Sequence, residues 1–172
     1  MADKIIMFSG KQYSGKDTVA KIMLAKMPDY RRCAIGDIIK LTYGAEKGLT
    51  YEEIEANKAV YRPDLIKLGN WGRAQDPDYW LKKIIEQTGN IMVTDVRVQH
   101  EYDVFKSAGA ITIRVEASRE TRAKRGELVG EDDVTETGLD NITNWDYVIE
   151  NNSDYETLSA KVDKIIDEIK SK

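Results

Sequence analysis

The sequence predicts an α/β fold, in which helices cover both faces of a parallel β-sheet. Three short apolar runs, Lys4–Ser9, Asn90–Thr94 and Ala110–Val115, are typical of strands buried on both faces. Segments with the apolar spacing of helices separate these runs. Strands that alternate with helices in this way favour a parallel sheet, because a parallel strand needs a crossover connection, usually a helix.

The first predicted strand is followed by a glycine-bearing loop and then by a helix. Val19, Ile22 and Met23 follow the helical period after this loop, and Pro28 ends the pattern. A strand, a glycine-bearing loop and a helix in this order form the setting in which a phosphate-binding loop is expected.

The middle of the chain is predicted to be mostly helical. Thr50 and Glu53 have the spacing of a capping box, and Pro63 is expected to interrupt the helix that they begin or to start the next one. The other helices expected here are Asp37–Tyr43, Asp64–Gly72 and Asp76–Gln87.

The C-terminal part is predicted to continue the alternation. Helices are expected at His100–Ala108 and Ser118–Arg125, and a short strand at Tyr147–Glu150. The polar segment Gly126–Asn144 lies between them and carries no predicted element. A last amphipathic helix repeats apolar residues every three to four positions up to Ile169. The length of 172 residues favours a single domain over residues 1–172.

The loop after the first strand matches a phosphate-binding motif. Gly10 to Lys16 reads G-x-x-x-x-G-K. Glycines let the backbone N–H groups close around phosphate oxygens, and the following helix N-terminus adds partial positive charge. Lys16 is therefore expected to reach the β- and γ-phosphates of a nucleotide.

One position departs from the common form of this motif. Asp17 stands where Ser or Thr usually holds Mg²⁺, and Thr18 follows it. A carboxylate can bind Mg²⁺ directly or through water, so the metal role is expected to remain with Asp17. The alternative is a glycine turn into a helix whose first turn carries an acidic residue, an arrangement that the helix dipole favours.

The second strong strand ends in a second candidate acid. Asp95 follows the apolar run of that strand, at the edge where open α/β sheets bind ligands. An acid at this place can hold the water shell of Mg²⁺. Arg97 is two residues further on and is a candidate for contacting a phosphate. The alternative is a strand-ending aspartate that simply pairs with a nearby arginine.

Arginines recur in the predicted helix after the third strand. Arg119, Arg122 and Arg125 are spaced by three residues, which places them roughly along one helix face. Mobile arginines can stabilise a transferring phosphoryl group when a lid closes over it. A solvated basic helix is the ordinary alternative.

A second basic group lies between the first two strong strands. Lys58, Arg62 and Arg73 lie in or beside the predicted middle helices. Guanidinium groups bind phosphate through two parallel hydrogen bonds, so Arg62 and Arg73 are the preferred candidates for an acceptor phosphate. An exposed arginine of no function is the alternative at each position.

Charge and hydropathy limit the kinds of partner. The formal net charge of −4 argues against binding of a nucleic acid polymer through bulk charge. No stretch approaches the roughly 20 apolar residues that cross a membrane, and Ile5–Phe8 is too short for a secretion signal. We therefore expect a cytoplasmic protein that binds a small molecule and no membrane.

Taken together, the motifs resemble those of a known group of enzymes. The stretches are F-S-G-K-x-x-S-G-K-D-T, D-P-D-Y-W, T-D-V-R-x-x-x-E-Y, R-x-x-R-x-x-R-G, T-E-T-G-L-D-N and D-Y-V-I-E-N. They are similar to those of the deoxynucleoside monophosphate kinases of bacteriophages and the animal-type phosphomevalonate kinases. The resemblance runs from Phe8 to the final helix.

The resemblance implies a three-layer P-loop kinase fold with a short lid at about residues 118–135, and a monomer or homodimer. It implies ATP and Mg²⁺ as cofactors, with Asp17, Thr18 and Asp95 near the metal. The implied nucleotide contacts are Gly10, Lys11, Ser14, Gly15, Lys16, Asp17 and Thr18. The implied acceptor contacts are Lys58, Arg62, Arg73 and Arg97, and the implied catalytic residues are Lys16, Asp17, Asp95, Arg97, Arg122 and Arg125.

The acceptor is open between two substrates. Asn57–Arg62 and Arg73–Pro77 look closer to the phosphomevalonate kinases. Val98 stands where those enzymes have a second arginine, and T-D-V-R-x-x-x-E-Y looks closer to the phage enzymes. The sequence favours a (deoxy)nucleoside monophosphate, with phosphomevalonate as the alternative and dephospho-coenzyme A as a weaker one. Asp17 also leaves open a nucleotide-binding module without turnover.

Overall fold

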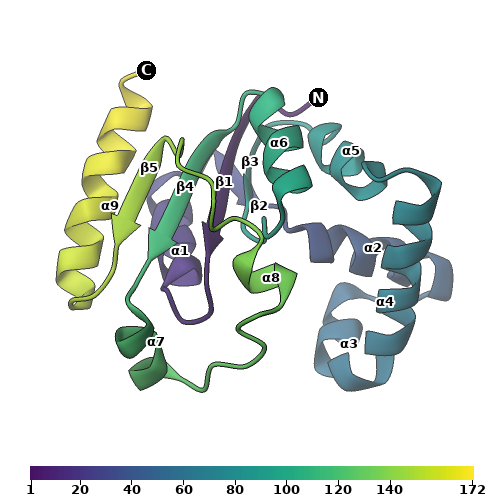
Figure 1. The fold of residues 1–172 in the computed structure, drawn as a ribbon. Helices are drawn as coiled ribbons and strands as arrows, with labels where there is room; N and C mark the ends of the chain where they lie inside the picture. Colours follow the sequence, from purple (N-terminus) through teal and green to yellow (C-terminus); the bar gives the residue numbers. More distant parts are fainter.

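The computed structural model describes all 172 residues and centres on a five-stranded parallel sheet in the order β2-β3-β1-β4-β5 (Figure 1). Every neighbouring pair of strands is parallel. The α/β class predicted from the sequence is confirmed. The strands are β1 (Lys4–Gly10), β2 (Tyr30–Arg32), β3 (Asn90–Val93), β4 (Ile111–Glu116) and β5 (Tyr147–Glu150).

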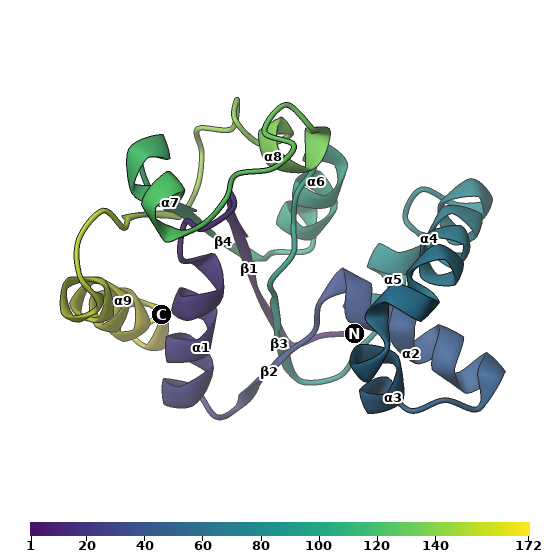
Figure 2. The same cartoon turned by 90° about the horizontal axis from the view of Figure 1, so that it is seen from below.

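Helices cover both faces of the sheet, which gives the predicted three layers (Figure 2). One face carries α1 and α9, and the other carries α2, α5 and α6. The bounds of these helices are α1 (Lys16–Lys26), α2 (Ile35–Lys47), α5 (Tyr79–Ile85), α6 (Gln99–Ser107) and α9 (Tyr155–Lys170).

The hydrophobic core is divided between these two faces because strand side chains alternate. In β1, Ile6 and Phe8 pack with α1 and α9, whereas Ile5 and Met7 pack with the helices of the opposite face. All four side chains are buried. The continuous apolar run of β1 therefore fills both cores.

Two groups of helices extend beyond the three layers. α3 (Tyr51–Ala56) and α4 (Lys58–Gln75) pack beside α2 and α5, away from the sheet (Figures 1 and 2). α7 (Arg119–Arg125) and α8 (Val134–Thr137) lie beyond the carboxyl ends of the strands. The edge of the sheet that carries the phosphate loop is thus flanked by both groups.

The middle helices differ from the sequence prediction. The capping box of Thr50 and Glu53 is present, but its helix ends at Ala56 and a new one begins at Lys58. Pro63 lies inside α4 and neither interrupts nor begins a helix, so that prediction was wrong. The break falls at Asn57 instead, whose backbone leaves the helical region. α2 and α5 contact α4, and this packing offsets the hydrogen bond that proline removes.

Two elements were missed by the sequence analysis. β2 has only three residues, two of them exposed arginines, so it lacks the apolar run that marked the other strands. α8 has four residues and lies inside the segment that was predicted to be irregular. None of the helices combines the length and apolar character needed to cross a lipid bilayer.

Candidate active site

The loop between β1 and α1 surrounds a pocket of about 440 Å³. Its lining includes every residue that the sequence analysis expected to contact a nucleotide. Arg97, Arg125 and Glu136 reach the same pocket from other elements. The full lining is Gly10, Lys11, Gln12, Tyr13, Ser14, Gly15, Lys16, Asp17, Thr18, Arg97, Arg125 and Glu136.

The conformation of this loop explains its glycine. Gly15 has φ 97°, in the left-handed region that glycine adopts without strain. A Cβ atom at this position would also lie 2.2 Å from Nδ2 of Asn151. That amide donates a hydrogen bond to the Ser14 carbonyl at 2.9 Å. Asn151, which follows β5, therefore fixes the backbone of the phosphate loop at Ser14 and Gly15.

Lys16 is placed to act as a free cation. Its side chain is 11% exposed, and its ammonium is 4.0 Å from the nearest oxygen of Asp17, too far for a hydrogen bond. Burial lowers its pKa, and the nearby charge of Arg97 lowers it further, whereas Asp17 and Asp95 act in the opposite direction. An anion entering the pocket would meet a cation that has no strong partner.

The residues expected to hold a metal ion form an open set. Asp17 and Thr18 line the pocket, and the Asp17 side chain is 82% exposed. No group of three or more His, Cys, Asp or Glu side chains is arranged to bind a metal alone. This donor set fits Mg²⁺, which keeps several waters and takes one or two carboxylates together with phosphate oxygens.

Asp95 has a structural contact that the sequence did not indicate. Its two carboxylate oxygens accept the N–H groups of Ile35 at 2.8 Å and Gly36 at 3.0 Å. It forms no ion pair with Arg97, so the alternative proposed from the sequence was wrong. Asp95 therefore fixes the beginning of α2 against the end of β3 and remains close enough to act on the pKa of Lys16.

The turn after Asp95 is held by Glu101 of α6. One oxygen of Glu101 accepts the N–H groups of Arg97 at 2.8 Å and Val98 at 3.2 Å. Burial raises the pKa of Glu101, and these two hydrogen bonds oppose that rise. The contact fixes the backbone of Arg97 while its side chain reaches the phosphate pocket.

The three arginines of α7 have different surroundings. Arg119 is exposed and forms a two-bonded ion pair with Glu131, with both distances 2.9 Å. Arg122 is buried, donates to the Ala117 carbonyl and keeps one amino nitrogen without a partner. Arg125 donates to the carbonyls of Tyr13 at 2.9 Å and Asn151 at 2.7 Å. Only Arg125 lines the phosphate pocket.

A basic groove of about 630 Å³ lies between α2 and α4. Three of the four expected acceptor contacts, Lys58, Arg62 and Arg73, line it together with Lys40 of α2. The fourth, Arg97, lines the phosphate pocket instead. Glu55 accepts hydrogen bonds from Lys40 and Lys58, which lower its pKa. The remaining lining residues are Gly36, Ile39, Ala59, Leu65, Ile66, Gly69 and Asn70.

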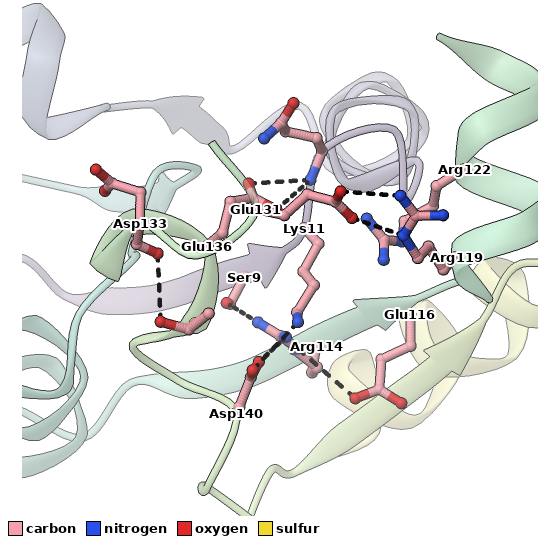
Figure 3. Close-up of polar contacts among 12 residues, drawn as sticks. Ser9, Lys11, Arg114, Glu116, Arg119, Arg122, Glu131, Asp133, Glu136 and Asp140 are labelled. Atoms are coloured by element: carbon pink, nitrogen blue, oxygen red, sulfur yellow. Dashed lines mark hydrogen bonds and ion pairs between the residues drawn. The ribbon is translucent and has the colours of Figure 1, made fainter. Parts of the chain in front are cut away.

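A second cavity of about 410 Å³ adjoins the phosphate loop and shares Lys11 and Ser14 with the phosphate pocket. Figure 3 shows Lys11 and Arg114 meeting at Asp140 beside it. Arg114 of β4 is buried and donates to Ser9 at 2.6 Å. The unpartnered nitrogen of Arg122 and the unpartnered hydroxyl of Ser14 belong to residues lining this cavity.

Several residues of these pockets were not found from the sequence. Glu136, Lys40 and Arg114 line the pockets but lie outside the predicted set. Glu101, which holds the turn of Arg97 without lining a pocket, also lies outside it. Lys40 carried no signal in the sequence, because only the packing of α2 against α4 brings it into the groove. Glu136 is the glutamate of the T-E-T-G-L-D-N stretch, which was a signal, but only the path of residues 126–144 brings it to the phosphate loop.

The fold and the pockets define the class of protein. A phosphate loop between the first strand and helix of a parallel sheet, flanked by an arginine-bearing helix and a basic groove, is the arrangement of P-loop kinases. A family model described as phosphomevalonate kinase matches residues 8–110, and one described as deoxynucleotide monophosphate kinase matches residues 64–162. Each match covers more than half of the chain.

Several solved structures, kinases among them, share the fold. Shikimate kinase from Bacteroides thetaiotaomicron aligns over 97% of this chain and 98% of its own, with 13% identity and a TM-score of 0.55. TT1252 from Thermus thermophilus aligns over 98% of both chains, with 17% identity and a TM-score of 0.57. APS kinase from Mycobacterium tuberculosis, in complex with AMPPNP and APS, aligns over 97% of both, with 14% identity and a TM-score of 0.51.

The chain belongs to the P-loop kinases that the phosphomevalonate kinase and deoxynucleotide monophosphate kinase families describe, and it is a phosphotransferase. The resemblance recognised in the sequence is confirmed at this level.

Proposed function

We propose that this kinase transfers the γ-phosphoryl group of ATP to the phosphate of a small monophosphorylated acceptor. The observation that carries the proposal is the position of the Asp95–Arg97 turn between two pockets. Arg97 lines the phosphate pocket, and Gly36, whose N–H is bound by Asp95, lines the basic groove. Donor and acceptor phosphates would therefore meet at this turn.

The residues of the phosphate pocket supply charge stabilisation and positioning. Lys16 would neutralise the β- and γ-phosphate oxygens, and Arg97 would align the two phosphates. Asp17, Thr18 and Asp95 would hold Mg²⁺, which neutralises charge on the same oxygens. Arg125 keeps the loop closed, and Arg122 offers a free nitrogen to the donor. An acceptor phosphate oxygen is already anionic and needs no general base.

The second cavity is the proposed place of the ATP base and ribose. It shares Lys11 and Ser14 with the phosphate pocket, so one ligand can extend through both. Its volume of about 410 Å³ is within the usual range for a small-molecule site. Ile142 and Leu139 give it apolar surface, and Asn152 and Ser118 give it polar groups.

The groove between α2 and α4 favours a compact aliphatic acceptor. Four cations line it, Lys40, Lys58, Arg62 and Arg73, and its apolar surface consists of aliphatic side chains. Phosphomevalonate has a phosphate and a carboxylate on a short aliphatic chain, which suits such a lining. The phosphomevalonate kinase match also spans the whole groove, because it covers residues 8–110. We therefore propose phosphomevalonate as the first candidate acceptor, in place of the nucleotide favoured by the sequence.

A (deoxy)nucleoside monophosphate is the second candidate. The deoxynucleotide monophosphate kinase match covers residues 64–162, which include Arg73, Arg97 and α7. A nucleoside monophosphate brings one anionic group to a groove lined by four cations, whereas phosphomevalonate brings two. We therefore propose the nucleotide second.

The test is ADP release measured with ATP and Mg²⁺ against phosphomevalonate and the eight common ribo- and deoxyribonucleoside monophosphates. We expect turnover with phosphomevalonate. Turnover with nucleotides alone would show that the second candidate is correct. Release of no ADP with any acceptor would contradict the proposal.

Two variants on α4 separate acceptor binding from general effects. Arg62→Ala should raise the KM of the acceptor by about tenfold or more, because a charge-assisted phosphate contact is lost, and should leave the KM of ATP unchanged. Lys67→Ala is the matched control, since Lys67 is exposed on the same helix and does not line the groove. Equal effects of the two changes would argue against this groove.

A further inference from the structure

A buried carboxylate lies inside the phosphate pocket. Glu136 of α8 is 7% exposed and lines the pocket. Its two oxygens accept the Gln12 N–H at 3.2 and 3.3 Å (Figure 3). It forms no ion pair with any lysine or arginine of the chain. A buried carboxylate that forms no salt bridge loses solvation without a direct ion pair in return, so its position in this pocket needs an explanation.

The phosphate loop itself supplies the explanation. Loops of this kind turn their backbone N–H groups toward an anion. The anion at the Gln12 N–H is the carboxylate of Glu136. A polyphosphate entering the pocket would bring several negative charges to the same amides and to the same carboxylate.

We propose that Glu136 is an internal anion that occupies the phosphate loop until the donor nucleotide displaces it. The inference rests on the proposed function, because it assumes that the pocket receives the phosphates of ATP. It assigns to Glu136 a role that opposes donor binding in the resting enzyme.

The segment around Glu136 is fastened to the loop at the same place. The side-chain amide of Gln12 donates to the Val129 carbonyl at 2.5 Å, and the Val129 N–H donates back at 3.1 Å. Lys11 pairs with Asp140 at 3.1 Å. Residues 129–140 are therefore held over the pocket by Lys11 and Gln12.

The same segment also touches the acceptor side. Gly138, directly after α8, packs so closely that a Cβ atom would lie 2.8 Å from the Arg97 carbonyl and 3.4 Å from Cα of Val98. Displacement of Glu136 would move the element that packs on this turn. Binding of the donor at Gln12 would thus shift α8, and the shift of α8 would move the backbone of Arg97.

Binding of a non-hydrolysable ATP analogue, AMPPNP with Mg²⁺, tests the proposal by calorimetry. Glu136→Gln keeps the size and one hydrogen-bond acceptor of the side chain and removes the charge. We expect its dissociation constant for AMPPNP to fall by about threefold to tenfold, the effect of removing one partly screened like charge. Glu131→Gln is the charge-matched control, because Glu131 pairs with Arg119 outside the pocket. Its dissociation constant should stay within about twofold of the wild type.

A second measurement uses the wild-type protein alone. Hydrogen exchange of residues 134–138 should become faster when AMPPNP binds, because α8 leaves the loop. A side chain that merely supports the closed segment would give slower exchange on binding.

The outcomes separate the inference from the proposed function. Unchanged or weaker AMPPNP binding by Glu136→Gln, or slower exchange in α8, would overturn the inference while the wild type still binds the analogue. Failure of the wild type to bind AMPPNP would overturn the proposed function and the inference with it.

Discussion

Burial of the Lys16 ammonium lowers the stability of the fold and prepares the residue to bind phosphate. Burial lowers its pKa because the pocket removes water from the ammonium, and Arg97 adds like-charge repulsion. The neighbouring carboxylates compensate only in part, and the nearest lies 4.0 Å away. The native state therefore carries a cation that is stabilised less than it would be in water. A phosphate would remove this deficit, which is why the residue suits phosphate binding.

Lys16→Met should abolish turnover without unfolding the protein. Loss of the cation should reduce kcat by at least about a hundredfold, as removal of one preorganised charge does in other enzymes. The melting temperature should stay equal to the wild-type value or exceed it, because the cost of burying a charge disappears. Steady-state kinetics and thermal unfolding measure the two effects, and near-normal turnover would contradict the mechanism.

The pH dependence of this effect has a defined sign. The pKa of Lys16 is lower in the folded than in the unfolded state, so the unfolded state binds more protons between these two values. Wild-type stability therefore rises with pH through that window. The stability advantage of Lys16→Met should shrink as pH approaches the ordinary pKa of lysine.

At the scale of elements, the four-residue helix α8 contacts two turns of the candidate active site. Its Glu136 contacts the phosphate loop, and Gly138 contacts the turn that carries Arg97. Asp133 caps its N-terminus by accepting the Thr135 N–H at 2.9 Å. A four-residue helix has little stability of its own. Its position depends on these contacts with the two turns beside it.

Gly138→Ala should disturb the acceptor side through the backbone. The new Cβ would lie 2.6 Å from the Val134 carbonyl and 2.8 Å from the Arg97 carbonyl, and neither is a flexible side chain. We expect a loss of about 1–3 kcal/mol of stability from overpacking, measured by urea unfolding, and a higher KM for the acceptor.

Gly48→Ala provides the control for that experiment. Gly48 has φ 70° at the end of α2, and its missing Cβ would meet no atom within 4 Å. The change should cost about 1–2 kcal/mol through the left-handed backbone and leave the KM of the acceptor unchanged. A raised acceptor KM in both variants would trace the effect to stability and not to α8.

At the scale of the whole molecule, the phosphate pocket and the cavity that adjoins it lie at one edge of the sheet. The phosphate loop follows β1, and Asp95 follows β3, which pairs with β1. α7 follows β4, the other neighbour of β1. Parallel strands bring all their carboxyl ends to this edge. Lys16 and Arg97, 81 positions apart, and Tyr13 and Arg125, 112 positions apart, therefore meet there. A nucleotide bound at this edge would contact residues that follow β1, β3 and β4, and would so connect these three strands.

Saturating ATP with Mg²⁺ should therefore stabilise the whole chain. A ligand present at about 100 times its dissociation constant adds about 2.7 kcal/mol to the unfolding free energy. For a protein of this size, that gain corresponds to an increase of about 5 to 11 °C in the melting temperature. Thermal unfolding with and without ATP measures it, and Lys16→Met should show a much smaller shift. An equal shift in the variant would argue against phosphate binding at Lys16.

The sequence by itself determined the fold class and the phosphate loop. Apolar runs and the G-x-x-x-x-G-K motif are local patterns, and local backbone geometry decides whether such a loop can form. The positions of Asp95 and Arg97 also followed from sequence, because residues after a parallel strand lie at the binding edge. Lys58, Arg62 and Arg73 were predicted on a different ground, as basic residues in or beside the middle helices.

The tertiary structure decided which groups meet across long sequence distances. It placed Glu136 against Gln12 and Lys40 beside Arg62, and it gave the arginines of α7 three different surroundings. It also corrected Pro63, which lies inside a helix. These features depend on how loops cross the sheet edge and on packing between helices, and such long-range contacts leave no periodic signal in the chain.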